Sequence, residues 1–373
     1  MSLEKIAEKI VKAQVKAPWM FLAVALVITL VLAPGLMNLF GNVEPSLEKV
    51  LPQDIHEVKL MNQMRTEYGA DMVYILLYTT NTLADVRNYE VLRYEDLLAQ
   101  KIRKNDYVLD VVSTADLVKE QNNNILPQSY DEIKNILHLD PRTPLYVKDD
   151  YSLAIMQVRT DTGAEADVVK KVIDSIDDDI ASLEQYNPGL EAKITGFNAI
   201  DKATFEIIIS DFILITLFSF ILISLTVYFT FRSLTKGLMP MIVVMVAIIW
   251  TMGIVGYVGI TITVVTMVAA AMLMGLGIDF GIHIVHNFFE LRKTLNPEKS
   301  LEETMKELLR AMIGSSFTTS AGFLALLFGT LPTMKNLGII LAIGIIATLL
   351  GAVFVLPVVV YLYDRSKSKK SSS

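Results

Sequence analysis

The chain of 373 residues contains no cysteine, no GxxxxGK[ST] phosphate loop and no HExxH zinc motif. The missing cysteine excludes disulfide bridges, cysteine metal ligands and cysteine nucleophiles. The two missing motifs argue against a nucleotide-driven motor and against a zinc protease. We therefore expect a protein that is not an enzyme, with no metal, no cofactor and no nucleic-acid partner.

Charged residues are absent from long stretches of the chain. Hydrophobic residues make up 53% of it, its mean hydropathy is +0.46, and residues 260–278 carry no charge. A helix needs about 20 apolar residues to cross the hydrocarbon core of a bilayer, so the lipid bilayer is the first expected partner. The sequence predicts six such helices, at residues 19–40, 207–231, 237–257, 260–288, 312–331 and 336–363.

The residues between the first and second predicted spans have a different character. Residues 41–205 contain 17 basic and 29 acidic side chains, a net charge of −12, whereas the rest of the chain carries +5. Stretches rich in β-branched and aromatic residues predict strands, and the stretches between them predict helices. The expected strands are residues 71–80, 107–114, 152–160 and 190–196, and the expected helices are 83–104 and 163–186.

These elements follow the order β-α-β, then an irregular insertion, then β-α-β. The insertion covers residues 115–148 and contains one short predicted helix at 130–137. This order is typical of a ferredoxin-like fold. The expected fold class is therefore an α-helical polytopic membrane protein of six transmembrane helices. An α+β, ferredoxin-like (porter-type) extracytoplasmic domain lies between its first and second helices.

The basic residues of the loops predict the orientation of the chain. Lysines and arginines gather before the first span, between the second and third, between the fourth and fifth, and after the sixth. All four segments fall on one side, which the positive-inside rule makes cytoplasmic. We therefore expect a cell-membrane protein with both termini in the cytoplasm, residues 41–205 outside and residues 364–373 as a cytoplasmic tail.

Two amphipathic segments accompany the spans. Residues 1–18 place Leu3, Ile6 and Val11 on one helical face and lysines elsewhere, which is typical of a helix lying flat on the membrane surface. A solvated extension of the first span is the alternative. A second amphipathic helix is expected in the cytoplasm at about residues 297–311, within the bundle of spans two to six that covers residues 206–363.

The fourth predicted span contains an acid at membrane depth. Asp279 and His283 are four residues apart and share a helical face with Gly275, whereas His286 is expected near the inner surface. An aspartate at that depth costs roughly 2.5–3.5 kcal/mol on insertion scales, so it indicates a function. Desolvation favours its protonated form, which suits a group that binds and releases protons. A permanently protonated acid that joins helices by hydrogen bonds is the alternative.

Small and hydroxyl-bearing residues accompany this aspartate. Gly277 and Gly281 have the GxxxG spacing that lets helices approach closely. Ser315 and Thr319 lie on one face of the fifth span, where they can donate hydrogen bonds to a carboxyl. The candidate proton relay is therefore Asp279, His283, Ser315 and Thr319, and the candidate packing glycines are Gly275, Gly277, Gly281 and Gly322.

The stretch "GLGIDFGIHIVHNFFELRK" resembles the fourth-span motif of the MMPL branch of the resistance–nodulation–division (RND) superfamily, which is related to the Patched and sterol-sensing-domain branch. In that motif a glycine-rich run leads into Asp-Tyr or Asp-Phe and then Gly. "TTSAGFLALLFGTLPTMKNLGIILAIGI" is similar to the fifth and sixth spans of the family, and the segment that begins "LPQD" resembles the start of its first extracytoplasmic domain. The family's proton-carrying aspartate carries over to Asp279, and Phe280 stands where a tyrosine often follows.

The resemblance implies a transporter of hydrophobic or amphiphilic, lipid-like molecules that is driven by the proton gradient. Family members usually carry twelve spans in two pseudo-symmetric halves, and this sequence resembles one half. The resemblance therefore implies a homo-oligomer, with a dimer favoured over a trimer. Its expected partners are protons, a lipid-like substrate and a second copy of the chain.

Three other interpretations stay open. The first is a metal site at Asp279, His283 and His286, because carboxylate and imidazole groups are common metal ligands. The second is an accessory subunit of the Sec protein-translocation system, which also has six spans and an RND-like core. The third is a membrane sensor that binds a sterol-like or isoprenoid lipid without transporting it.

Overall fold

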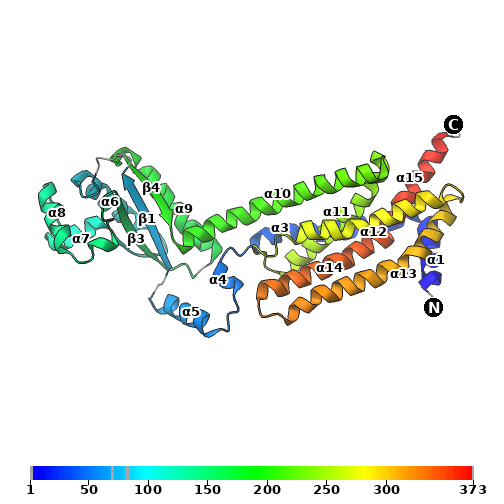
Figure 1. Ribbon diagram of the computed structural model, residues 1–373, viewed down its shortest axis with the longest axis horizontal. Helices are drawn as coiled ribbons and strands as arrows, with labels where there is room; N and C mark the ends of the chain where they lie inside the picture. Colours follow the sequence, from blue (N-terminus) through cyan, green and yellow to red (C-terminus); the bar gives the residue numbers. More distant parts are fainter. Residues whose placement is uncertain (1–2, 69–70, 80–84, 164, 372–373) are drawn as a thin grey trace. The chain divides into compact units, whose positions relative to one another are not determined.

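The structure is a computed structural model that describes residues 3–68, 71–79, 85–163 and 165–371 (Figure 1). The chain divides into two compact units, one of residues 1–44 and 207–373 and the other of residues 45–206. Within the described residues, six helical segments are long and apolar enough to cross a membrane, as the sequence predicted. They are Pro18–Gly41, Phe197–Phe231, Leu234–Val258, Ala269–Leu291, Pro297–Phe328 and Pro332–Lys367.

The first unit is helical. It begins with α1 (Leu3–Lys16), α2 (Pro18–Leu32) and α3 (Gly35–Gly41) and continues from α10 (Phe197–Phe231) through α11 (Leu234–Val258), α12 (Ala269–Leu291), α13 (Pro297–Leu324), the short η3 (Ala325–Phe328), α14 (Pro332–Phe354) and α15 (Leu356–Ser371). α14 packs against α11, α12 and α13, which lie side by side (Figure 1). α2 and α10 keep most of their apolar side chains exposed, as a helix facing lipid does.

The fourth span starts later than the sequence predicted. Residues 260–268 are not helical, and α12 begins at Ala269. Ile262 instead pairs with Val43, and the Thr266 hydroxyl accepts a hydrogen bond from the Thr263 N–H at 2.8 Å. The segment is rich in β-branched residues, whose side chains compete with helix formation. The predicted start at residue 260 was therefore wrong.

The amphipathic segment at 297–311 and the fifth span are one continuous helix, α13. Asn296 caps it by accepting a hydrogen bond from the Lys299 N–H at 2.9 Å, and Pro297 occupies its first turn. No proline interrupts the helix after that turn, so nothing in the sequence separates the two parts. The charged first half and the apolar second half therefore share one axis.

The apolar face of α1 is covered by protein. Ala7, Val11 and Gln14 are buried, and they pack in a cluster with residues of α13 and α15. The Gln14 side chain donates a hydrogen bond to the Val353 carbonyl oxygen at 2.8 Å. The sequence placed this face on the membrane surface, but the facing helices offer apolar partners that bury it instead. α1 is therefore part of the helical unit.

The second unit contains a four-stranded antiparallel sheet. Its strands are β1 (Asp71–Thr79), β2 (Val108–Val112), β3 (Leu153–Thr160) and β4 (Leu190–Thr195), in the spatial order β2-β3-β1-β4. This is the ferredoxin-like order predicted from the sequence. In the central pair, Ile75 lies opposite Met156 and Leu77 lies opposite Ala154. Alternate residues of β1 are buried, so one face of the sheet meets the core.

Helices α6 (Tyr89–Ile102) and α9 (Ala166–Ser182) supply that core. Leu92, Leu98 and Ile176 are fully buried against the inward side chains of β1 and β3. The insertion contains α8 (Tyr130–Leu139) and also α7 (Thr114–Gln121), which the sequence did not predict. The unit also holds α4 (Leu47–Val50), α5 (His56–Tyr68) and the short turns η1 (Thr143–Leu145) and η2 (Glu184–Tyr186).

Candidate functional site

A cavity between α12, α13 and α14 gathers the four residues of the candidate relay. Its volume is about 370 Å³, and Asp279, His283, Ser315 and Thr319 all line it. The other side chains that line the cavity are apolar: Leu276, Phe280, Leu308, Ala311, Met312 and Ile345. A carboxyl, an imidazole and two hydroxyls thus share one hollow in an otherwise apolar helix bundle.

Two hydrogen bonds set the register between α12 and α13. The Asn287 amide donates to Glu307 Oε2 at 2.7 Å, and the Thr304 hydroxyl donates to Asn287 Oδ1 at 3.1 Å. The helices are antiparallel neighbours, so two turns back along α12 correspond to two turns forward along α13. The same register brings Ser315 opposite Asp279. The spacing of four between Asp279 and His283 then places both on the cavity.

The relay candidates share the cavity without direct bonds to the aspartate. Among the described residues, no hydrogen bond joins the Asp279 carboxyl to His283, Ser315 or Thr319. Asp279 and His283 are both exposed in the single chain. Rotation of side chains within the cavity is therefore what would bring a donor to an ionised Asp279.

The four candidate packing glycines fall into two classes. A Cβ on Gly277 would meet Thr348 Cγ2 of α14 at 3.0 Å, and a Cβ on Gly281 would meet the Pro240 α-carbon of α11 at 2.8 Å. Gly277 and Gly281 therefore lie at helix contacts inside the bundle. Gly275 and Gly322 are exposed and have open space around them, and Gly275 lies one turn from Asp279 on α12.

The histidine farther along α12 lies apart from this group. His286 is exposed and does not line the cavity. Within the described ranges, no group of three histidine or acidic side chains is arranged to hold a metal ion. Asp279, His283 and His286 therefore do not assemble the metal site that the sequence left open.

Three polar residues beside the cavity were not singled out from the sequence. Asn287, Thr304 and Glu307 form the hydrogen-bonded group that joins α12 to α13. Asn287 follows Asp279 by eight residues and Glu307 precedes Ser315 by eight, so each lies two turns along the same stripe. This spacing was the available signal, but only the register shows that the two stripes face each other.

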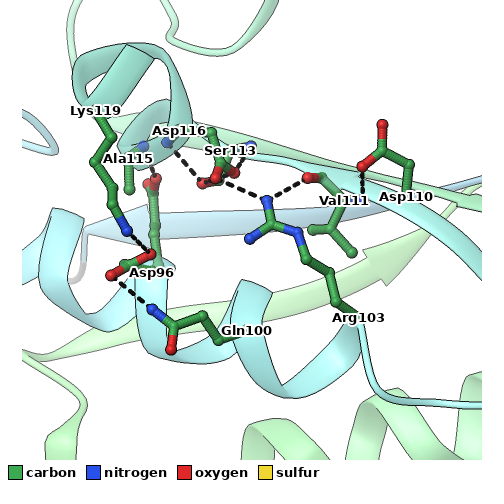
Figure 2. A network of polar contacts seen from close by, with 10 residues as sticks. Asp96, Gln100, Arg103, Asp110, Val111, Ser113, Ala115, Asp116 and Lys119 are labelled. Atoms are coloured by element: carbon green, nitrogen blue, oxygen red, sulfur yellow. Dashed lines mark hydrogen bonds and ion pairs between the residues drawn. The ribbon is translucent and has the colours of Figure 1, made fainter. Parts of the chain in front are cut away.

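A buried carboxyl also lies in the core of the α+β unit. Glu95 is 0% exposed, and its Oε2 accepts a hydrogen bond from the Ala115 N–H at 3.1 Å, at the start of α7. Burial raises the pKa of Glu95 to about 8. Figure 2 shows the surrounding network, in which Arg103 binds Asp116 and Lys119 binds Asp96. Glu95 therefore titrates near neutral pH in the folded unit.

The fold and the cavity define a multi-pass membrane protein with an ionisable group between its helices. The chain belongs to the MMPL family, a family of membrane transporters, because the family model matches residues 49–373. This match confirms the family that the fourth-span motif resembles.

Individual relatives agree with this assignment. The chain is 29% identical to the Methanocaldococcus jannaschii protein MJ1562 over 98% of this chain and 96% of that protein. It is 25% identical to the multidrug resistance protein MdtF of Escherichia coli O157:H7, over 61% of this chain and 26% of MdtF. It is 26% identical to the solvent-resistant pump membrane transporter SrpB of Pseudomonas putida, over 48% of this chain and 17% of SrpB. These distant matches support a relation to the RND superfamily.

Proposed function

We propose that this protein is a proton-gradient-driven transporter of hydrophobic or amphiphilic, lipid-like molecules, with Asp279 as the proton carrier. The observation that carries the proposal is the cavity that Asp279 shares with His283, Ser315 and Thr319. The names of MdtF and SrpB, a multidrug resistance protein and a solvent-resistant pump, agree with small hydrophobic cargo. Among the described residues that line the cavity, only Asp279 and His283 have an ionisable side chain.

Proton binding at Asp279 changes which neighbours it prefers. The protonated carboxyl can stay against the apolar wall formed by Leu276 and Phe280. The ionised carboxylate needs hydrogen-bond donors, which Ser315, Thr319 or His283 supply after rotation within the cavity. Each exchange of partners shifts α12 relative to α13 and α14. This two-state movement is the step that couples the proton gradient to transport.

The exposed face of α12 supports a homo-oligomer of such half-transporters. Asp279 is exposed in the single chain, and facing lipid would cost an ionised side chain at this depth roughly 2.5–3.5 kcal/mol. Gly275, one turn from Asp279 on α12, leaves open space where another helix can approach closely. A second copy related by a two-fold axis would cover this face, so a dimer is favoured over a trimer.

The substitution Asp279→Asn tests the carrier role. Asparagine keeps the size and hydrogen-bonding capacity of the neutral acid but cannot titrate. In proteoliposomes with an imposed pH gradient, we expect the variant to fold and to assemble as the wild type does. It should lose gradient-driven movement of the hydrophobic probe N-phenyl-1-naphthylamine and the accompanying proton flux. If Asp279→Asn moves the probe and protons at the wild-type rate, Asp279 is not the proton carrier and serves only to join helices by hydrogen bonds.

A variant of His283 tests its role in the proton relay separately from the role of Asp279 as proton carrier. His283 lies one turn from Asp279 and lines the same cavity, so His283→Ala should slow proton flux and shift its pH dependence without stopping it. A lipid sensor or a Sec-type accessory subunit would move neither the probe nor protons in either variant or in the wild type. Such a result would favour one of those alternatives.

A further inference from the structure

The first half of α13 carries four acidic side chains, of which Glu302, Glu303 and Glu307 lie close together in sequence. Glu302 and Glu303 both form salt bridges with Lys306, and the Glu303 contact is 3.1 Å long. In the described part of the chain no salt bridge holds Glu307, whose carboxylate instead accepts a hydrogen bond from the neutral Asn287 amide at 2.7 Å. The Asn287 amide is neutral, so this hydrogen bond brings no positive charge to the Glu307 carboxylate.

The Asn287 amide is itself held in place. The buried Thr304 hydroxyl donates to Asn287 Oδ1 at 3.1 Å, which orients the amide nitrogen toward Glu307. Thr304 is 0% exposed, whereas Glu307 is exposed. The group therefore fixes an exposed carboxylate at the α12–α13 contact.

The residue that follows Glu307 on α13 lines the Asp279 cavity. Leu308, the next residue of α13, lines the cavity together with His283 of α12. Asn287 is eight residues beyond Asp279, a rise of about 12 Å along the helix, and His283 lies halfway between them. The register that places Ser315 opposite Asp279 thus places Glu307 two turns from the aspartate, past His283.

We propose that Glu307 is the proton-exchange group between the Asp279 cavity and the water at the α12–α13 loop, positioned by Asn287 and Thr304. This inference rests on the proposed function of Asp279. The Glu307 carboxylate accepts the proton that Asp279 releases past His283 and then gives it to water, and the reverse sequence loads Asp279. No group other than these side chains and water is needed.

Several ionisable groups lie near Glu307, on its own helix and on the helices packed against it. On its own helix, Glu303 and Lys306 lie on the preceding turn and Arg310 on the following one. On α12 the nearest ionisable side chains in the sequence are His286, which directly precedes Asn287, and His283 and Glu290, one turn on either side of it. The other helices packed on α13 contribute the following ionisable groups near its first half: Glu8 and Lys12 of α1, which pair with each other, and Asp364 of α15, which binds Arg292 at 2.8 Å. α14 has Lys335 as its one charged residue, at the opposite end.

The test uses the full chain in proteoliposomes and follows proton flux with N-phenyl-1-naphthylamine as the probe. Glu307→Gln keeps an acceptor for the Asn287 amide but cannot carry a proton. We expect its proton flux to fall at least about tenfold, since a positioned proton-transfer group contributes orders of magnitude. Its flux should also lose the dependence on the pH of the compartment that Glu307 faces. Glu303→Gln, which removes a neighbouring carboxylate, should retain the wild-type rate and pH profile.

A second variant separates proton transfer from structure. Glu307→Ala should be slow as well and should recover flux when formate, a small weak acid, is added at a concentration that leaves the pH gradient intact. Asp279→Asn should show no such recovery. If Asp279→Asn stops transport but Glu307→Gln matches the wild type at every pH, the role of Glu307 is wrong. That role is equally wrong if Glu303→Gln is as slow as Glu307→Gln or if formate restores no flux. If Asp279→Asn transports normally, the proposed function itself fails.

Discussion

A Cβ placed on Gly256 would stand 1.9 Å from the carbonyl oxygen of Gly35, so α3 and α11 cross with their backbones in contact. The contact is reciprocal, because a Cβ on Gly35 would stand 2.2 Å from the Gly253 carbonyl oxygen. Neither oxygen can move aside as the end of a flexible side chain can. Small residues are what let two membrane helices approach this closely.

Gly256→Ala is therefore expected to destabilise the helical unit by about 1–3 kcal/mol, the usual cost of overpacking a close contact. Thermal unfolding in detergent, followed by tryptophan fluorescence, measures the loss. Gly41→Ala on α3 is the matched control, since a Cβ there meets nothing within 4 Å. Equal melting temperatures for the two variants would show that the α3–α11 crossing accommodates the extra methyl group without a loss of stability.

The open glycine beside Asp279 gives a prediction about assembly. Gly275→Leu places a large side chain where the single chain has empty space, so folding should be unaffected. If a second copy covers this face, the association constant should fall at least about tenfold, which is about 1.4 kcal/mol. Native mass spectrometry from detergent measures the proportion of oligomer. Leu217→Trp on α10, which is 55% exposed, is the control, and an unchanged oligomer in Gly275→Leu would place the interface elsewhere.

The buried Glu95 makes the stability of the α+β unit depend on pH. Its pKa is about 8 in the folded unit against an ordinary value of 4.5, so folding favours the protonated form. The stabilisation is complete below pH 4.5 and is lost as pH rises toward 8. The free energy of unfolding should therefore fall by on the order of 4 kcal/mol across that window.

Urea-dependent proteolysis of the full chain, scored for cleavage within residues 45–206, can follow this loss at pH 5 and pH 8. Glu95→Gln keeps an acceptor for the Ala115 N–H without a charge, so its unfolding midpoint should stay nearly constant between the two values. Glu90→Gln, an exposed change on the same helix, should behave as the wild type does. A wild-type midpoint that does not move with pH would contradict the buried ionisation.

Orientation in the membrane can be tested without background, since the chain has no cysteine. Ser129→Cys, at an exposed position of the α+β unit, should react with an impermeant maleimide added to intact cells. Thr294→Cys, exposed in the loop between α12 and α13, should react only after the membrane is opened. The expectation follows from the basic residues of that loop. Labelling of Thr294→Cys in intact cells would reverse the proposed orientation.

The sequence alone was sufficient for the elements whose signal is local. Apolar length is enough to predict a membrane helix, and stretches rich in β-branched and aromatic residues predicted β1 and β3 to within a residue or two. The order of strands and helices then indicated the ferredoxin-like sheet. The local signal failed in two places. Residues 260–268 are apolar enough for a span, but they are not helical and Ile262 pairs with Val43. Helix α7 was not predicted because its sequence is largely polar.

The candidate site shows the same division between local and distant information. Helical spacing alone put Asp279, His283 and Gly275 on one stripe of α12, and Ser315 and Thr319 on one stripe of α13. Spacing within a helix cannot tell which stripe of one helix meets which stripe of another, because that depends on packing between surfaces far apart in the sequence. Only the tertiary structure, through the bonds of Asn287 with Thr304 and Glu307, sets the register in which the two polar stripes close around one cavity.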